Sequence, residues 1–292
     1  MTLFVNLRAS ENGGIVAGEA SAWKYGDDGG ASPVSAQGFA ERVAGCQVLF
    51  ATHGFNVDQQ GGVDALSMWS RNCQLPGSFL FVGVLWPGDS AFLPVIDYVY
   101  EGVEAIASGK LLAAYLNQNA TRAQSISFVS HSLGARTVLE TVSGLAADPR
   151  RVILMAAAIE NDCLSNEYVN AARKASEVFV IASKSDYVLE WAFPAGNLVG
   201  EIVMSGHPYD RTALGRCGPA WPVPSDVNAV SLQIPDAWDY GHLDYLPKDT
   251  IGPPFPPPVS EPGPQAGVPG ESPPPDGWKP AWSAGVVATQ AT

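Results

Sequence analysis

The pentapeptide SHSLG at residues 130–134 constrains the fold of this chain more than any other segment. It follows an apolar run typical of a buried strand and precedes a stretch, residues 135–145, that is typical of a helix. A serine at the apex of a strand–turn–helix unit, with small residues two positions to either side, is the pattern of a nucleophile elbow. Ser130 stands where the usual G-x-S-x-G pattern has glycine. The sequence therefore predicts that the central residue, Ser132, is a nucleophile.

A nucleophilic serine needs a general base, and the chain offers four histidines. His131 adjoins the predicted nucleophile, and its side chain is expected to point away from the hydroxyl. His53 lies where another strand runs into a glycine turn. His242 follows a strand-like run at residues 229–234, and in one common chain order of serine triads the histidine comes last. We therefore expect His242 to be the base, with His207, in a Gly/Pro-rich loop, as the open alternative.

The base needs an acid that orients its ring. Asp186 follows the β-branched, apolar run at residues 177–182, and chemistry in α/β folds gathers at the carboxyl ends of parallel strands. Asp162 follows the preceding strand-like run at residues 152–157 and is a second candidate, although it could instead cap a helix. We expect Asp186 to be the acid and keep Asp162 in reserve.

Two backbone N–H groups must face the oxyanion that forms during acyl transfer. One is expected from Leu133, directly after the nucleophile at the N-terminus of the predicted helix. The loop at residues 53–56 (HGFN) follows an apolar strand one βαβ unit and a strand earlier, and we expect its Phe55 N–H to be the other donor.

The chain carries, in this order, HGFN 53–56, WPG 86–88, SHSLG 130–134, Asp162, Ser185-Asp186, RTALG 211–215 and Gly241-His242. They occur in the order seen in the α/β-hydrolase superfamily, and they look most like a little-characterised bacterial branch with HGY/FN, WP and HS-M/L-G motifs. The resemblance covers residues 45–246 and implies a serine hydrolase with Ser132 as nucleophile, Asp186 as acid and His242 as base. It supplies no substrate, because members of this superfamily cleave many kinds of bond.

The middle of the chain alternates strand-like and helix-like segments, which predicts an α/β fold with a mostly parallel central sheet and helices on both faces. A single α/β-hydrolase domain is expected over residues 1–246, with one edge strand near residues 3–7. Strands are expected near 48–52, 80–85, 125–129, 152–157, 178–182 and 229–234, and helices near 62–72, 94–116, 133–145 and 163–175.

Two stretches interrupt this alternation. Residues 187–227 carry Trp191, Phe193 and Trp221 among prolines and glycines; they predict either a cap that lines the substrate pocket or an irregular surface loop. Residues 247–292 hold more than half of the 24 prolines and few large aliphatic side chains, so a solvated, proline-rich tail is expected there.

Bulk properties exclude some functions. A net charge of −13 argues against nucleic acid or an anionic membrane as the main partner. The sequence has no apolar run of the roughly 18 residues that a membrane span needs and no recognisable signal peptide, which predicts a cytoplasmic protein. No metal or phosphate-binding motif is present, so no cofactor is expected. The four cysteines are expected to be free thiols, with Cys46–Cys73 and Cys163–Cys217 bridges left open.

The predicted activity is hydrolysis of a small-molecule carboxylic ester with an apolar moiety, through an acyl-enzyme on Ser132. Thioesterase, amidase or acyltransferase chemistry on the same triad is the nearest alternative. A non-catalytic hydrolase-fold module that acts through its tail is the other. Removing residues 247–292 is expected to leave the turnover of a hydrolase largely intact and to abolish the function of such a module.

Overall fold

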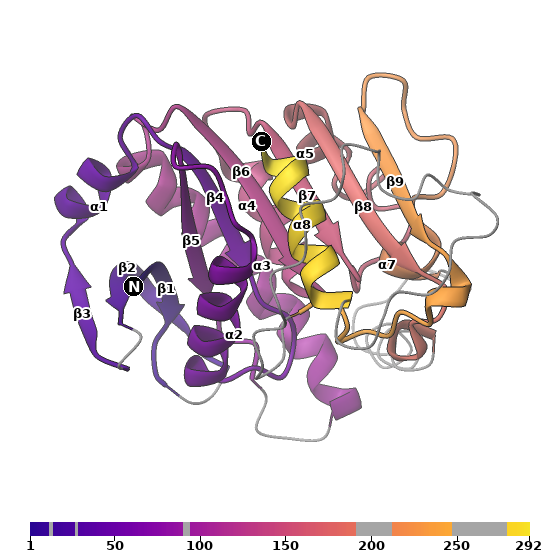
Figure 1. Cartoon of the computed structure of the whole chain (residues 1–292), viewed down its shortest axis with the longest axis horizontal. Helices are drawn as coiled ribbons and strands as arrows, with labels where there is room; N and C mark the ends of the chain where they lie inside the picture. Colours follow the sequence, from indigo (N-terminus) through magenta and orange to yellow (C-terminus); the bar gives the residue numbers. More distant parts are fainter. Residues whose placement is uncertain (12–13, 27–28, 90–93, 191–211, 247–278) are drawn as a thin grey trace.

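The computed structural model describes residues 1–11, 14–26, 29–89, 94–190, 212–246 and 279–292. Their strands form one sheet in the order β3-β2-β1-β5-β4-β6-β7-β8-β9 (Figure 1). Strands β1 and β5 to β9 run parallel with β4, whereas β2 is antiparallel to both β1 and β3. The strands are β1 (Thr2–Arg8), β2 (Val16–Tyr25), β3 (Ala31–Val34), β4 (Gln47–Thr52), β5 (Phe79–Leu85), β6 (Ser125–His131), β7 (Arg151–Met155), β8 (Glu177–Ser183) and β9 (Ala229–Ile234).

Helices cover both faces of this sheet (Figure 1). Helices α3, α4 and α5 lie on one face, and α2 and α8 lie on the other. The prediction of a mostly parallel sheet with helices on both faces is therefore confirmed. The helices are α1 (Ala36–Val43), α2 (Gln59–Asn72), α3 (Pro94–Asn119), α4 (Gly134–Gly144), α5 (Val169–Lys174), α7 (Leu214–Cys217) and α8 (Lys279–Ala291), with a short 3₁₀ turn, η1 (Asp236–Trp238).

The central strands are short apolar runs because both of their faces are buried. Phe50 on β4 and Phe128 on β6 are fully buried, and their rings stack at 5.5 Å between centroids. The carboxyl ends of β4, β6 and β8 lie at the same edge of the sheet, since these strands are parallel. This edge is where the loops with the predicted catalytic residues begin.

The N-terminal segment contains more structure than the sequence predicted. Instead of one edge strand, it contributes β1, β2, β3 and α1, and β1 lies inside the sheet between β2 and β5. Strand β2 exposes much of its length, so its glycine, alanines and glutamate hide the apolar alternation by which a strand is predicted.

The expectation of a solvated extension is wrong for the end of the chain. Residues 279–291 form α8, which packs against α2 and β7 and buries Trp282 and Val287. Proline dominates the composition of residues 247–292 as a whole, and this average conceals a short segment that is rich in alanine and includes two valines and Trp282. A helix this short gains its stability from packing its apolar side chains against the domain.

Two further observations concern the whole described structure. All four cysteines are free thiols, as expected. Among the described helices, none combines the length and the apolar character that crossing a bilayer would require.

Candidate active site

Ser132 occupies the sharp turn between β6 and α4. Its φ of 54° lies in the left-handed region, which is rare for a residue other than glycine and typical of a strained functional turn. The turn is fixed on both sides: the Ser132 N–H donates to the Met155 carbonyl at 3.0 Å, and the Ala135 N–H donates to the Ser132 carbonyl at 3.1 Å. A side chain at Gly134 would place its Cβ 2.4 Å from the His53 carbonyl oxygen, so this position needs glycine.

The Ser132 hydroxyl, the His242 ring and the Asp186 carboxylate form a continuous hydrogen-bonded chain. Ser132 Oγ lies 2.9 Å from His242 Nε2. On the other side of the ring, His242 Nδ1 lies 2.8 Å from Asp186 Oδ2. The carboxylate is fully buried, and the imidazole is 10% exposed. Ser132 and His242 are 110 positions apart in the sequence, and Asp186 and His242 are 56 positions apart.

Asp186 is held in place by its own loop. It lies in the turn after β8, which ends at Ser183, and its Oδ1 accepts a hydrogen bond from the Leu189 N–H at 3.0 Å, which leaves Oδ2 for His242. The reserve acid, Asp162, lies on a different loop, where its carboxylate accepts a hydrogen bond from the Asn166 side chain at 2.7 Å. Asp162 does not cap a helix either, because α5 begins seven positions later at Val169.

His131 contacts His242 rather than the Ser132 side chain. Its Nε2–H donates to the main-chain carbonyl of His242 at 2.7 Å, and the two rings lie 4.9 Å apart. Burial lowers the pKa of His131 to about 3, with a smaller contribution from the neighbouring His242. The ring is therefore neutral near pH 7 and acts as a hydrogen-bond donor at Nε2.

The loop at residues 53–56 lies directly against the elbow. A Cβ on Gly54 would come within 2.8 Å of Ser132 Cβ and 3.0 Å of His131 Nδ1. Only a residue without a side chain lets this backbone approach the nucleophile so closely. The loop that the sequence assigned to the oxyanion is thus next to the Ser132 side chain, and Phe55 follows Gly54 there.

The WPG segment at residues 86–88 forms hydrogen bonds with this loop through Trp86 and Gly88. The Trp86 Nε1–H donates to the His53 carbonyl at 2.8 Å, and the His53 ring stacks on Trp86 at 5.8 Å. The Gly88 carbonyl accepts from the N–H groups of Asn56 and Val57, at 2.5 and 3.3 Å. Burial lowers the pKa of His53 to about 4, so its ring is neutral near pH 7.

Arg8, at the end of β1, is buried and contacts Val57, the residue that follows this loop. Its guanidinium donates to the carbonyl of Trp86 at 3.1 Å and to that of Val57 at 3.4 Å. It also forms an ion pair with Asp89, and its side chain has no exposed surface. Arg8 could not be selected from the sequence, since a lone arginine at a strand end carries no motif.

Leu133 presents its N–H at the start of α4. Within the part of the chain that the structure describes, no acceptor takes this group. The position at the N-terminus of a helix adds the favourable end of the helix dipole. An anion next to Ser132 would therefore meet at least one backbone donor in a favourable field.

The predicted substrate contacts are only partly visible. Trp221 is 67% exposed on the loop before β9. Trp191, Phe193 and the alternative base His207 lie outside the described residues. In the described segments, no three His, Cys, Asp or Glu side chains gather in a way that could hold a metal ion.

The parallel sheet, with its elbow at the carboxyl edge and its helices on both faces, defines an α/β-hydrolase fold. The chain belongs to the family described as "Alpha/beta hydrolase of unknown function (DUF900)", whose model matches residues 37–226. The matched range includes Ser132 and Asp186 and ends before His242.

Solved structures similar to this chain include three esterase structures. Acetyl xylan esterase 1 from Thermoanaerobacterium sp. JW/SL YS485 has 10% sequence identity, 82% of each chain covered and a TM-score of 0.37. Esterase B from Lactobacillus rhamnosis, in a C6-C4 SN3 inhibited form, has 11% identity, 64% of each chain covered and a TM-score of 0.31. A further structure of that esterase, from strain HN001, has 12% identity, the same 64% coverage of each chain and a TM-score of 0.30. No curated protein matches the chain.

Proposed function

We propose that this protein is a serine hydrolase that cleaves carboxylic esters through an acyl-enzyme on Ser132. The observation that carries the proposal is the hydrogen-bonded chain from Ser132 Oγ through His242 to Asp186, with links of 2.9 and 2.8 Å. Both distances lie within the range in which a base can take the proton of a nucleophile and an acid can orient that base.

The order of the contacts gives each group its role. Asp186 accepts the Nδ1–H of His242, which leaves Nε2 unprotonated and facing the Ser132 hydroxyl. As Oγ attacks the ester carbonyl carbon, its proton passes to Nε2, and the buried carboxylate stabilises the imidazolium that forms. Nε2–H then donates this proton to the leaving alcohol. A water molecule, deprotonated by Nε2, attacks the acyl-enzyme in the same way, and Ser132 is released with its proton restored.

The oxyanion is assigned to the N–H groups of Leu133 and Phe55. Leu133 offers an N–H at the N-terminus of α4, and Phe55 follows the glycine whose backbone lies against Ser132. Loss of one such donor costs about 3 kcal/mol of transition-state stabilisation in serine hydrolases. Trp86 donates to the His53 carbonyl in this loop, and Arg8 donates to the carbonyl of Val57, which follows it; both contacts support a role that demands a fixed backbone.

The substrate is assigned only by class. Trp221, together with Trp191 and Phe193, is proposed to contact an apolar part of the ester. Thioesters, amides and acyl acceptors other than water use the same chemistry, so a panel of matched oxygen esters, thioesters and anilides decides among these classes.

The test is covalent labelling with a fluorophosphonate probe, together with hydrolysis of a short-chain nitrophenyl ester. We expect the parent protein to be labelled at Ser132 and to turn over the ester, and Ser132→Ala to do neither. Ser143→Ala is the matched control, because this α4 serine only donates to the Leu139 carbonyl within its own helix. Removing the base by His242→Ala should lower turnover by about 10²- to 10⁴-fold. Full activity of the His242 variant would transfer the role to His207, and absence of labelling in the folded parent would refute the proposal.

A further inference from the structure

The C-terminal helix α8 docks on the loop that carries His242, far from it in the sequence. The Tyr240 hydroxyl, two residues before His242, forms hydrogen bonds with the Lys279 carbonyl and the Ser283 hydroxyl on α8. Both the Tyr240 and Ser283 side chains are fully buried, and the rings of Tyr240 and Trp282 lie edge to face at 5.7 Å. The base loop is therefore packed against a helix that the sequence places beyond a long proline-rich segment.

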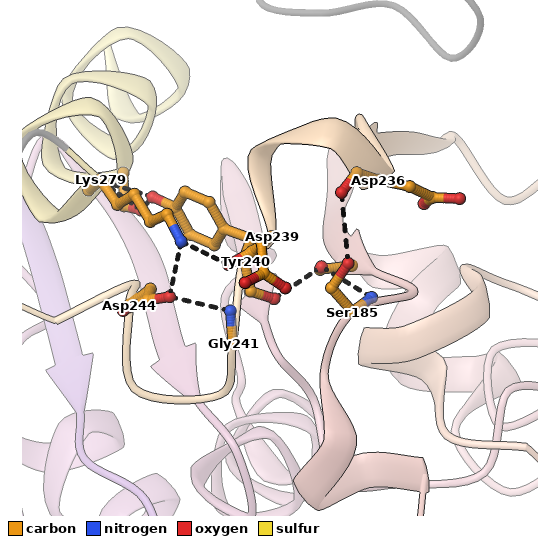
Figure 2. Close-up of polar contacts among 9 residues, drawn as sticks. Ser185, Asp236, Asp239, Tyr240, Gly241, Asp244 and Lys279 are labelled. Atoms are coloured by element: carbon orange, nitrogen blue, oxygen red, sulfur yellow. Dashed lines mark hydrogen bonds and ion pairs between the residues drawn. The ribbon is translucent and has the colours of Figure 1, made fainter. Parts of the chain in front are cut away.

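Lys279 adds a charged contact at the first turn of α8 (Figure 2). Its ammonium group donates to the Asp239 carbonyl and to the Asp244 carboxylate, the latter at 3.0 Å. The same carboxylate oxygen accepts the Gly241 N–H at 2.9 Å. Lys279 thus contacts the loop that carries His242 on both sides of this residue: at the Asp239 carbonyl before it and at the Asp244 carboxylate after it.

The loop is also tied to the strand that delivers the acid. The Ser183 hydroxyl, at the end of β8, donates to the Tyr240 carbonyl at 2.7 Å and accepts the Ser185 N–H at 3.2 Å. Asp186 is the next residue. In Figure 2, Ser185 is drawn on one side of Tyr240 and Lys279 on the other. The acid loop, the base loop and α8 therefore share one set of hydrogen bonds.

We propose that Lys279 is a positioning residue for His242 and acts through the Asp244 carboxylate. This inference rests on the proposed function, because it assigns Lys279 to the base of that triad. Lys279 and Asp244 are each three-quarters buried, so loss of the ammonium group removes a cationic partner from a largely desolvated carboxylate. The Asp244 carboxylate then relaxes towards water and releases the Gly241 N–H. His242 follows, and a displacement of about 1 Å at a catalytic group can lower the rate about 10²-fold.

The same contacts change what truncation is expected to do. Removal of residues 247–292 takes away α8 together with its bonds to Tyr240, Asp239 and Asp244. We therefore expect the truncated protein to turn over the ester more slowly, whereas the sequence alone predicted that turnover would stay largely intact. Loss of activity on truncation therefore does not distinguish a hydrolase from a module that works through its tail, and single substitutions on α8 are the sharper test.

The experiment compares Lys279→Met with Lys279→Arg and with a matched control, Lys110→Met. Lys110 is 69% exposed on α3, and its distance to Glu140 is 3.9 Å. We expect Lys279→Met to lower kcat for the nitrophenyl ester and the rate of Ser132 labelling by about 10- to 100-fold with KM unchanged. Lys279→Arg, which keeps the cation, should recover most of the rate, and Lys110→Met should have no effect.

Two further measurements separate positioning from general stabilisation. Hydrogen exchange of the backbone amides of residues 239–245 should accelerate in Lys279→Met and not in Lys110→Met. If Lys279 acts through the carboxylate, Lys279→Met should cost little more in an Asp244→Asn background, because the two losses are coupled.

Each outcome has a defined meaning. Faster exchange with unchanged kcat, or unchanged exchange in residues 239–245, would overturn the positioning role. Fully additive losses in the double variant would overturn the route through Asp244. A folded parent that neither labels nor hydrolyses the ester would refute the proposed function instead, and the exchange comparison would still decide whether Lys279 orders the loop.

Discussion

The Nε2–H of His131 donates a hydrogen bond of 2.7 Å to the main-chain carbonyl of His242. The residue next to Ser132 in the sequence is therefore in direct contact with the backbone of His242, the proposed base. This contact joins the turn at Ser132 directly to the loop that carries His242. Helix α8 contacts the same loop at Tyr240 and Asp239. His131 in the SHSLG segment therefore helps to position His242 relative to Ser132.

Loss of this donor should impair catalysis without removing any member of the triad. We expect His131→Leu to lower ester turnover about 10- to 100-fold, because the His242 carbonyl loses its partner and the base loop can shift. His131→Gln should retain most activity, since the glutamine amide nitrogen can take the place of Nε2 as donor. The rate of fluorophosphonate labelling at Ser132 measures both variants. Equal activity of the leucine and glutamine variants would contradict this role.

The buried histidines should make stability depend on pH. Burial lowers the pKa of His131 to about 3 and that of His53 to about 4, whereas a histidine in the unfolded chain titrates near 6.5. Between these values the unfolded chain binds more protons than the folded protein, so the free energy of unfolding falls as the pH is lowered from about 6.5 towards 4. Each histidine should contribute a loss on the order of 1 kcal/mol per pH unit in this window.

His131→Gln removes one of these two groups and serves as the test of the pH dependence. Urea unfolding at pH 7 and at pH 5 should show a smaller loss of stability for this variant than for the parent. A loss of the same size in both proteins would mean that His131 is not proton-linked to folding.

Gly54 should tolerate no side chain. A Cβ at this position would lie 2.8 Å from Ser132 Cβ, a distance that real Cβ contacts do not reach, so Gly54→Ala must displace the elbow or the loop. We expect ester turnover to fall at least about 10²-fold, since both the nucleophile and the proposed Phe55 donor move. Gly77→Ala is the control, because nothing lies within 4 Å of a Cβ there. Comparable activity of the two variants, measured on folded protein, would show that the elbow absorbs the methyl group.

Much of the fold could be predicted because its central strands are short apolar runs between helices. The strand at residues 229–234 was predicted with the bounds that the structure shows. Strand β2 and helix α8 could not be predicted in this way. The former has a mixed, half-exposed pattern, and the latter lies in a segment whose average composition is dominated by proline.

The candidate site shows the same division. Chain order and strand ends were enough to select Ser132, Asp186 and His242, which the structure brings within hydrogen-bonding distance. The residues that hold them could not be selected, because their contacts join segments remote in sequence: Arg8 reaches the loop after β4, and Lys279 reaches the loop after β9. A long-range contact of a single charged side chain leaves no periodicity or spacing to detect.

Arg8 provides the last prediction, which concerns stability and catalysis together. The fully buried guanidinium donates to the Trp86 and Val57 carbonyls and pairs with Asp89. Arg8→Met would remove this cation from beside the Asp89 carboxylate, which is 14% exposed, and would remove the donor from the Trp86 and Val57 carbonyls. Removing one partner of such a pair costs about 3 to 5 kcal/mol, measurable by urea unfolding. Arg8→Lys should recover only part of this, because an ammonium group cannot reproduce the planar fork of donors.

The matched control is Arg173→Met, since Arg173 and its partner Asp226 are 43% and 60% exposed. This surface pair should contribute at most about 1 kcal/mol. In addition, turnover by folded Arg8→Met should fall, because Val57 directly follows the loop that carries Phe55, and loss of its contact loosens the backbone of the proposed oxyanion donor. Destabilisation with unchanged turnover would separate the two effects and would show that Trp86 and Gly88 suffice to hold the loop. A stability loss no larger than that of Arg173→Met would mean that the contacts of Arg8 stabilise the fold no more than an exposed ion pair does.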